Sequence, residues 1–171
     1  MSTTIEAAPE ALNSVVSSLV GQVGQEVKAR AYRTANELQN QANHVLRGER
    51  SGRRYKKPGT YRRQRDPVSG KMRNGVYYTA SAPGEPPANR TGAFRGSWHR
   101  KVYAQDLDGH NFNVRGVTES DLKVGTKRKY LLGDLLEDGT PTMKPRPYKQ
   151  RVIDRAMPKV LRIYHEPYLR G

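Results

Sequence analysis

Residues 81–98, SAPGEPPANRTGAFRGSW, join a stiff loop to a short aromatic segment. The first half is rich in proline and glycine, which neither a helix interior nor a central strand accepts. The second half begins at Thr91, whose hydroxyl is suited to cap a short helix. Phe94 and Trp98 then lie one turn apart on one face of that helix. The stretch therefore predicts a fixed loop that delivers two large rings to the core.

Large rings are scarce elsewhere, because the 171 residues include only two Phe and one Trp, beside ten Tyr. Apolar residues make up 35% of the chain, a low share that favours one compact core with long exposed segments. The residues predicted to build this core are Phe94, Trp98, Tyr130, Leu136 and Tyr148.

Upstream of this stretch, residues 9–46 show the three-and-four spacing of an amphipathic helix. Pro9 suits its first position, whereas Gly21 and Gly24 each weaken it by about 1 kcal/mol, so a bend or break is expected near them. Because a small core cannot cover so long a helix, part of the stripe is expected to meet another chain; burial within its own chain is the alternative. The stripe consists of Leu12, Val15, Val16, Leu19, Val23, Val27, Ala31, Ala35, Leu38, Ala42 and Val45.

Residues 47–75 carry eleven basic and two acidic side chains and almost no aliphatic ones. Such a segment buries too little apolar surface to offset its ordering entropy, so a long loop or arm is expected. Tyr55 and Tyr61 lie among the cations, a mixture that suits stacking on bases beside phosphates; a solvated charge run is the alternative. The predicted contacts to nucleic acid or an acidic partner are Arg53, Arg54, Lys56, Lys57, Arg62, Arg63 and Arg65.

The remaining chain predicts short strands followed by helices. Residues 76–79 read as a strand end, and 100–105, 111–118 and 121–126 as an antiparallel meander. Residues 129–140 read as a short helix or apolar turn closed by Asp138-Gly139. A last helix opens at Pro147, is kinked or split by Pro158, and has a basic face that is either solvated or contacts an acidic partner.

These elements define an α+β fold with a long N-terminal helix, a small antiparallel sheet of three to four strands, a C-terminal helix and an extended basic arm. We divide the chain into an amphipathic helix (1–46), a basic loop or arm (47–75) and an α+β core (76–171), within a single domain.

Several function classes find no support in the residues. The chain lacks cysteine, which excludes disulfides and thiolate metal sites. The four histidines share no metal-ligand spacing, and no P-loop or GxSxG motif is present. We therefore expect no enzyme, no metal and no cofactor. No apolar run approaches the ~20 residues that a bilayer span needs, and the amino terminus lacks a signal-peptide pattern, so a soluble protein made in a cytoplasm is expected.

The formal net charge of +15 is concentrated in two places, +9 in residues 47–75 and +6 in residues 144–171, where eight basic side chains face two acidic ones. A localised positive field attracts polyanions or an acidic protein surface.

Three pieces of the sequence, SAPGEPPANRTGAFRGSW, VGTKRKYLLGDLLEDGT and MKPRPYKQRVIDRA, together resemble the neck or tail-completion protein family of long-tailed bacteriophages. The resemblance covers about residues 78–156. Two features depart from it, the length of the basic insertion and the final YHEPYLRG. The matching positions are Pro83, Gly84, Pro87, Thr91, Gly92, Val124, Gly125, Thr126, Tyr130, Leu136, Glu137, Gly139, Thr140, Pro145, Arg146, Pro147 and Tyr148.

The resemblance implies a structural virion protein, assembled in the host cytoplasm, that forms a ring at the head-tail junction and joins, completes or terminates the tail. It implies a homo-oligomer, hexameric with a dodecamer as the alternative, between a head-closure or connector protein and a tail tube protein. A nucleic-acid-binding protein acting through residues 47–75 is the alternative function. The subunit or partner contacts that the family resemblance implies are Pro83, Gly84, Pro87, Glu137, Gly139 and Thr140.

Overall fold

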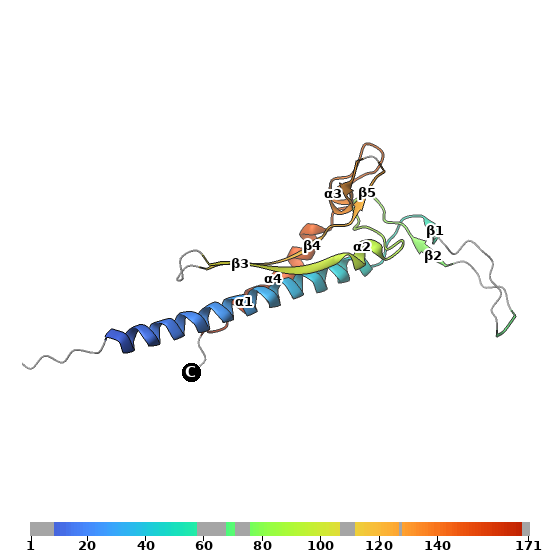
Figure 1. Ribbon diagram of the computed structural model, residues 1–171. Coiled ribbons are helices and arrows are strands. Elements are labelled where there is room, and N and C mark those ends of the chain that lie inside the picture. Colours follow the sequence, from blue (N-terminus) through green and yellow to red (C-terminus); the bar gives the residue numbers. More distant parts are fainter. Residues whose placement is uncertain (1–8, 58–67, 71–75, 107–111, 127, 169–171) are drawn as a thin grey trace, which may run out of the picture.

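The computed structural model describes residues 9–57, 68–70, 76–106, 112–126 and 128–168. They form a mixed α and β structure built along one long helix (Figure 1). The predicted α+β class, with a long N-terminal helix, antiparallel pairing and a C-terminal helix, is confirmed.

Helix α1 runs from Pro9 to Arg47, a length of about 58 Å at 1.5 Å per residue. It continues through Gly21 and Gly24, so the break considered there does not occur. Its C-terminal half is covered by other elements and buries Ala31, Ala35 and Ala42, whereas Leu12 near the N-terminal end is 57% exposed. The two halves of α1 therefore have different surroundings.

Strands β3 (Trp98–Asp106) and β4 (Phe112–Ser120) form an antiparallel hairpin that lies along α1 (Figure 1). The strand lies against the helix backbone at Gly116, where an added Cβ would stand 1.8 Å from the carbonyl oxygen of Ala31. The absence of a side chain at this position lets the strand contact the helix backbone directly.

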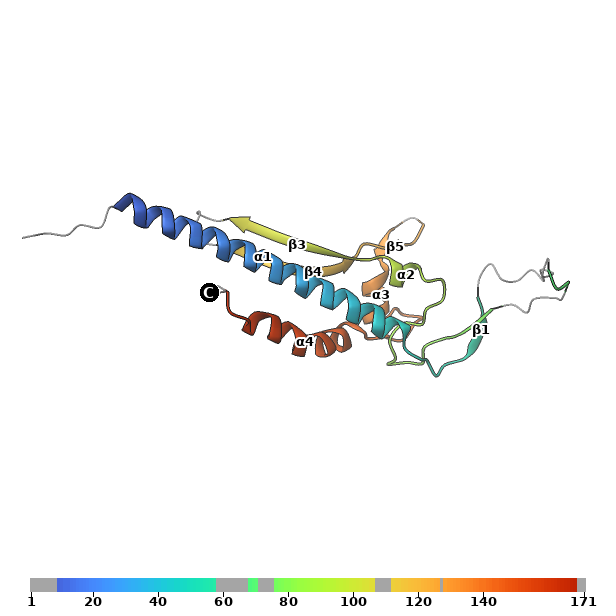
Figure 2. The same cartoon turned by 90° about the horizontal axis from the view of Figure 1, so that it is seen from below.

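Helix α4 (Lys149–His165) packs antiparallel to the C-terminal half of α1, on a different side from the hairpin (Figure 2). This direction brings Lys159 within 2.6 Å of Glu37, and Glu166 within 2.8 Å of Arg33. Pro158 lies at an exposed position inside α4 and does not split it, so the predicted split is wrong.

Among the described residues, three two-stranded sheets replace the predicted single sheet. Beside the hairpin, β1 (Arg54–Lys56) pairs with β2 (Tyr77–Thr79), and β5 (Lys123–Val124) pairs with β6 (Tyr130–Leu131). The predicted third strand of the meander thus pairs forward with β6 and not back with β4.

The core lies where α1, α4, α2 (Ala93–Gly96) and α3 (Leu132–Asp138) converge. The rings of Phe94, Trp98 and Tyr148 meet edge to face, with centroids 5.6–5.8 Å apart. Tyr148 is buried, and Phe94, Trp98 and Leu136 are partly buried against it. Tyr130 is 50% exposed, so its assignment to the core is wrong; β6 holds it at the surface.

Helix α2, which carries Phe94 into the core, is shorter than the sequence predicts. Helix α2 ends at Gly96, and Trp98 is the first residue of β3, so the two rings do not share a helix face. The Thr91 hydroxyl accepts the N–H of Ala93 at 3.3 Å. The N-cap residue is Gly92, however, and no side chain caps α2, so the predicted cap by Thr91 is wrong.

Candidate functional site

Two loops that are far apart in sequence are hydrogen bonded to each other beside the core. The N–H of Gly84 donates to the carbonyl of Pro145 at 3.2 Å. The guanidinium of Arg146 donates to both the carbonyl and the hydroxyl of Ser81, and reaches the carbonyl of Ala82 at 3.4 Å. The proline-rich loop and the entry to α4 therefore form one unit.

The turn between α3 and α4 is held by residues predicted to contact a partner. The Glu137 carboxylate accepts the N–H groups of Tyr148 and Lys149 at 2.9 and 3.2 Å, which satisfies free donors at the start of α4. Gly139 has a φ of +82°, a conformation that disfavours a side chain. The Thr140 hydroxyl accepts the Met143 N–H at 3.0 Å. All three residues fix the loop within their own chain.

The other three predicted partner contacts divide by exposure. Pro83 and Gly84 are exposed at the tip of the loop, where a neighbour has access to them. Pro87 is buried, and its carbonyl accepts hydrogen bonds at 3.3 and 3.1 Å from the guanidinium of Arg50. The prediction of a surface contact at Pro87 is therefore wrong, since the residue is buried and Arg50, just beyond α1, binds its carbonyl.

Glu85 fastens the base of the basic arm to this loop. Its carboxylate accepts the Ser51 hydroxyl at 2.5 Å, the Ser51 N–H at 3.1 Å and the Ala82 N–H at 2.8 Å. These hydrogen bonds, that of the Ser51 hydroxyl above all, lower the pKa of Glu85 to about 2. The carboxylate is therefore charged at all but strongly acidic pH.

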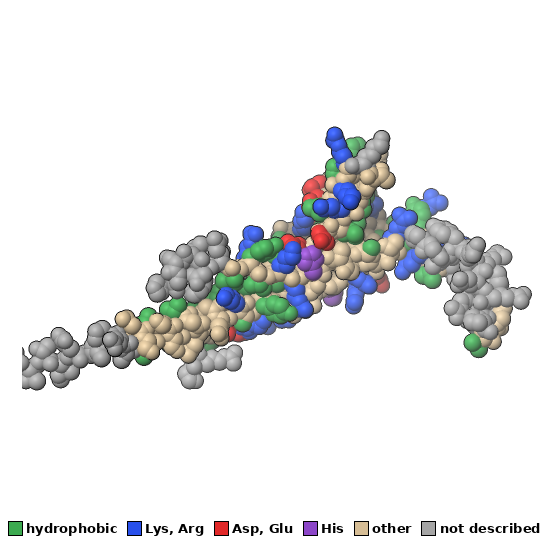
Figure 3. All heavy atoms as spheres, in the orientation of Figure 1, with side chains coloured by type: hydrophobic (Ala, Val, Ile, Leu, Met, Phe, Trp, Pro, Cys, Tyr) green, Lys and Arg blue, Asp and Glu red, His purple; other side chains and the backbone are tan. Residues whose placement is uncertain are grey.

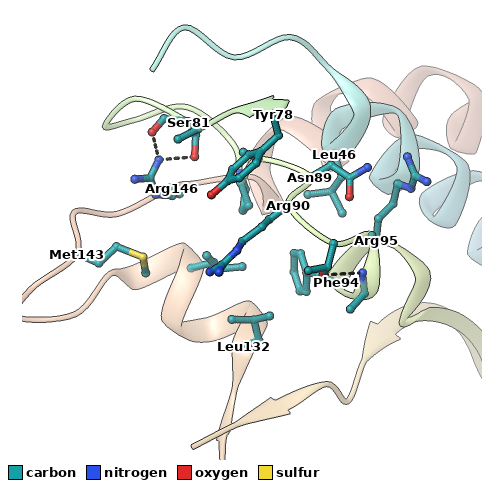
Figure 4. A pocket seen from close by; sticks show the side chains of 17 residues that line it. Leu46, Tyr78, Ser81, Asn89, Arg90, Phe94, Arg95, Leu132, Met143 and Arg146 are labelled. Atoms are coloured by element: carbon teal, nitrogen blue, oxygen red, sulfur yellow. Dashed lines mark hydrogen bonds between the residues drawn. The ribbon is translucent and has the colours of Figure 1, made fainter. Parts of the chain in front are cut away.

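A cavity of about 570 Å³ opens between the two loops and the core. In Figure 4, the contact of Arg146 with Ser81 lies on one side, Phe94 and Leu132 on the other, and Tyr78 and Arg90 between them. Its wall therefore combines apolar groups with cationic ones. Five residues that carry the family resemblance line this cavity: Pro87, Thr91, Gly92, Leu136 and Arg146.

The described part of the basic arm pairs with β2 and places cationic side chains beside tyrosine rings. We call this set of residues the ladder: Arg53, Arg54, Tyr55, Lys56, Tyr77 and Tyr78. The guanidinium of Arg54 lies 4.8 Å from the ring centroid of Tyr77, and Lys56 lies 6.0 Å from the same ring. Tyr55 stacks on Tyr78 at 6.0 Å. Figure 3 shows Lys and Arg side chains along the body and at the base of the arm.

The remaining predicted arm contacts are placed as follows. Arg53 lies 5.7 Å from the Tyr55 ring, and the Lys57 N–H donates to the Val76 carbonyl at 2.7 Å. These residues belong to the ladder or continue it. Arg62, Arg63 and Arg65 lie outside the described residues.

Two helices present apolar side chains to solvent. Near the N-terminal end of α1, Leu12, Val15, Val16 and Leu19 are 40–58% exposed. On α4, the exposed stripe consists of Ile153, Met157, Leu161 and Tyr164, which are 41–51% exposed. Contiguous exposed apolar residues of this kind are typical of protein–protein contacts.

Within the described ranges, no group of three or more His, Asp or Glu side chains is arranged to hold a metal ion. None of the helices described there combines the length and the apolar character that crossing a membrane requires.

Comparison with known proteins adds nothing to these observations, because no family model, no curated protein and no solved structure matches the chain significantly.

Sequence reasoning missed the residues that lock the site together, chiefly Arg50, Ser51, Ser81 and Glu85. Most of their partners lie 34 or more residues away or are backbone groups, so no spacing pattern marks them. It also missed the exposed stripe of α4, although its three-and-four spacing is legible in the sequence.

Proposed function

We propose that this chain is a structural subunit of a bacteriophage neck, forming a homo-oligomeric ring that joins or completes the tail at the head-tail junction. One observation carries the proposal. The pieces that resemble the neck protein family come from separate parts of the sequence, yet Gly84 bonds to Pro145, Arg146 to Ser81, and Glu137 to the start of α4. Because hydrogen bonds join these separate segments to one another, they are suited to form a rigid docking surface.

The exposed apolar stripes support an oligomer. A free helical segment of about a dozen residues is marginal in water, and the N-terminal half of α1 exposes apolar side chains along most of its length. A neighbouring subunit that covers it stabilises both chains. Repeated around a symmetry axis, contacts that are weak one by one hold a ring together.

In this proposal the basic arm faces the packaged DNA or an acidic neighbouring ring, and the loop at Pro83 and Gly84 stacks on the connector or the tail tube. The role needs no reaction, because positioning and binding accomplish it. The chemistry of the cavity, apolar with cationic edges, suits insertion of an acidic or amphipathic segment from an adjacent ring.

Complementation in extracts tests the proposal. An extract of infected cells that lack this protein should hold filled heads and finished tails, and adding the purified full chain should restore infectious particles. The Arg146→Ala variant should restore far fewer, because the loops lose their cross-link, whereas Arg128→Ala, at an exposed position away from the loops, should restore as many as wild type. Failure of the wild-type chain to restore any particles contradicts the proposal.

A second function, nucleic-acid binding through the arm, is favoured by the ladder of cations on tyrosine rings. We expect Arg53→Gln, Arg54→Gln, Lys56→Gln and Lys57→Gln together to weaken DNA retention by the purified chain and to reduce its log–log salt slope by up to about 3–4. A control that removes the same charge elsewhere replaces Lys123, Arg128, Lys129 and Lys144 by Gln. Equal DNA retention by the arm variant and wild type rules out this second function.

A further inference from the structure

One face of α1 runs the whole length of the helix, but the chain covers only half of it. Along this face, steps of four and three residues place Leu12, Val16, Leu19 and Val23 in line with Glu26, Arg30, Arg33 and Glu37.

The second half of this face contacts the C-terminal region of the same chain. Arg30 donates to the carbonyls of Tyr164 and Pro167 at 3.4 and 2.7 Å, and Glu37 pairs with Lys159 at 2.6 Å. The first half lies beyond the end of α4 (Figure 2). It presents Leu12 and Val16, which are 57% and 52% exposed. The apolar half of this face therefore lies in line with the half that packs on α4, but no helix of the same chain packs on it.

Helix α4 has a stripe with the matching spacing. Val152, Ala156 and Ile163 are buried toward α1. Beside that face, Ile153, Met157, Leu161 and Tyr164 follow one another in steps of four, four and three. Two helices with apolar residues at such steps pack side by side, with the side chains of one between those of the other.

The charges of the two stripes favour a mixed pair. Residues 9–25 contain one glutamate, Glu10, and no lysine, arginine or histidine; the next acidic residue, Glu26, is already paired with Arg30 and Arg33. Residues 149–165 contain five lysines and arginines and a single acidic residue, Asp154. Pairing two α4 helices would bring basic chains together, whereas pairing α4 with the α1 segment, which has no basic residue, avoids that repulsion.

We infer that the N-terminal half of α1, at Leu12, Val15, Val16 and Leu19, packs on the exposed α4 stripe of a second copy of this chain. The two surfaces differ, so the contact is head to tail, and each subunit offers one of each; such contacts generate a closed ring when the rotation permits. This inference rests on the proposed ring and names the surfaces that close it.

The absence of cysteine makes the contact measurable by cross-linking. The full chain with Val16→Cys and Met157→Cys, treated with a short bis-maleimide, should give a ladder of covalent multimers that stops at the ring size. Within one chain the two positions are about 30 Å apart, since Met157 lies near the level of Glu37 on α1, so the link cannot form inside a subunit. Mixing the two single variants should give only dimers that contain one of each.

Matched variants make the result decisive. Ser17→Cys with Met157→Cys places the thiol on the opposite face of α1, and its ladder should be lost or at least tenfold weaker. Leu12→Ser with Val16→Ser should abolish oligomers while the far-ultraviolet circular dichroism remains that of wild type, because these side chains are exposed in the monomer.

Two results overturn the inference. A Val16→Cys or Met157→Cys single variant that cross-links to itself shows a symmetric contact instead, and a double variant without intermolecular product shows that the stripes do not meet. The neck proposal has a separate readout: rings that form without this cross-link, or particles restored by the Leu12→Ser, Val16→Ser chain, refute the contact and leave the neck role standing.

Discussion

At Gly116 the backbone of β4 lies directly against the backbone of α1. A methyl group there would stand 1.8 Å from the carbonyl oxygen and 3.2 Å from the nitrogen of two α1 residues, Ala31 and Ala35, and both are backbone atoms that cannot rotate away. Overpacking of this kind costs about 1–3 kcal/mol and more where backbones must separate. The hairpin therefore depends on this glycine for its contact with the helix.

A pair of glycine substitutions tests that dependence. Gly116→Ala should lower the free energy of unfolding by about 3 kcal/mol. Gly21→Ala should raise it by about 0.5–1 kcal/mol, because the position is helical and an added Cβ meets nothing within 4 Å. Urea unfolding of the full chains measures both. Equal midpoints for Gly116→Ala and wild type would show that α1 and the hairpin do not pack at this distance.

Glu85 gives the junction of arm and loop a pH dependence. Its pKa falls from an ordinary 4.5 to about 2, so the folded chain holds the proton less tightly than the unfolded one. The stabilisation it contributes is complete above about pH 4.5 and is lost as the pH falls from there toward 2.

The difference in melting temperature between wild type and Glu85→Gln should therefore be largest near neutral pH and shrink between pH 4.5 and 2. Thermal unfolding at several pH values measures it. Glu49→Gln, which removes an exposed carboxylate just beyond α1, serves as the matched control. A Glu85→Gln difference that stays constant down to pH 2.5 contradicts the assigned hydrogen bonds.

At the scale of the elements, the end of α4 is clamped to α1 through Arg30. The side chain is fully buried, bonds to Glu26 at 3.0 Å, and stacks 3.7 Å from the ring centroid of Tyr168. Its carbonyl partners are Tyr164, in the last turn of α4, and Pro167, two residues beyond the end of the helix. One cation therefore satisfies groups that the end of a helix leaves free.

Arg30→Met should release this end, because the methionine fills the space but donates no hydrogen bond. Amide hydrogen exchange in residues 160–168 should accelerate at least tenfold, and the urea midpoint should fall. Arg33→Met is the matched control: its ion pairs with Glu26 and Glu166 are partly exposed, and pairs of that kind contribute at most about 1 kcal/mol. Similar exchange rates in the two variants would show that Arg30 does not hold α4.

The helices and the hairpin were predictable from sequence because their signals are local. The spacing of Leu12 to Val45 predicts α1 to within one residue at its end, and the alternation in residues 100–118 predicts the hairpin. The partner of Lys123-Val124 was not predictable, since both β4 and β6 are neighbours in sequence that can pair with it. The surface position of Tyr130 was not predictable either, because it follows from the pairing of β5 with β6.

The site was predictable in its parts but not in its assembly. The proline-glycine loop and the Leu-Glu-Asp-Gly-Thr turn were recognisable as segments. That Glu137 serves the start of α4, and that Pro87 is covered by Arg50, depends on contacts between distant segments. The arm was recognisable by charge alone, whereas its attachment through Ser51 and Glu85 required the folded chain.

At the scale of the whole molecule, the chain combines a rigid junction of loops, a basic arm and two uncovered apolar stripes. Each of these suits contact with a different neighbour: an adjacent ring, packaged DNA or an acidic surface, and a second copy of the chain. The proposed neck ring uses all three at once, with α1 as the rod that links them (Figure 1).

The most direct measurement is electron microscopy of particles assembled without this protein, beside particles from the same phage with the protein restored. If the protein joins heads to tails, we expect DNA-filled heads lying apart from complete tails in the first sample and joined virions in the second. Joined, normal virions in the absence of the protein would contradict it, and the arm's nucleic-acid binding would then be the function to pursue.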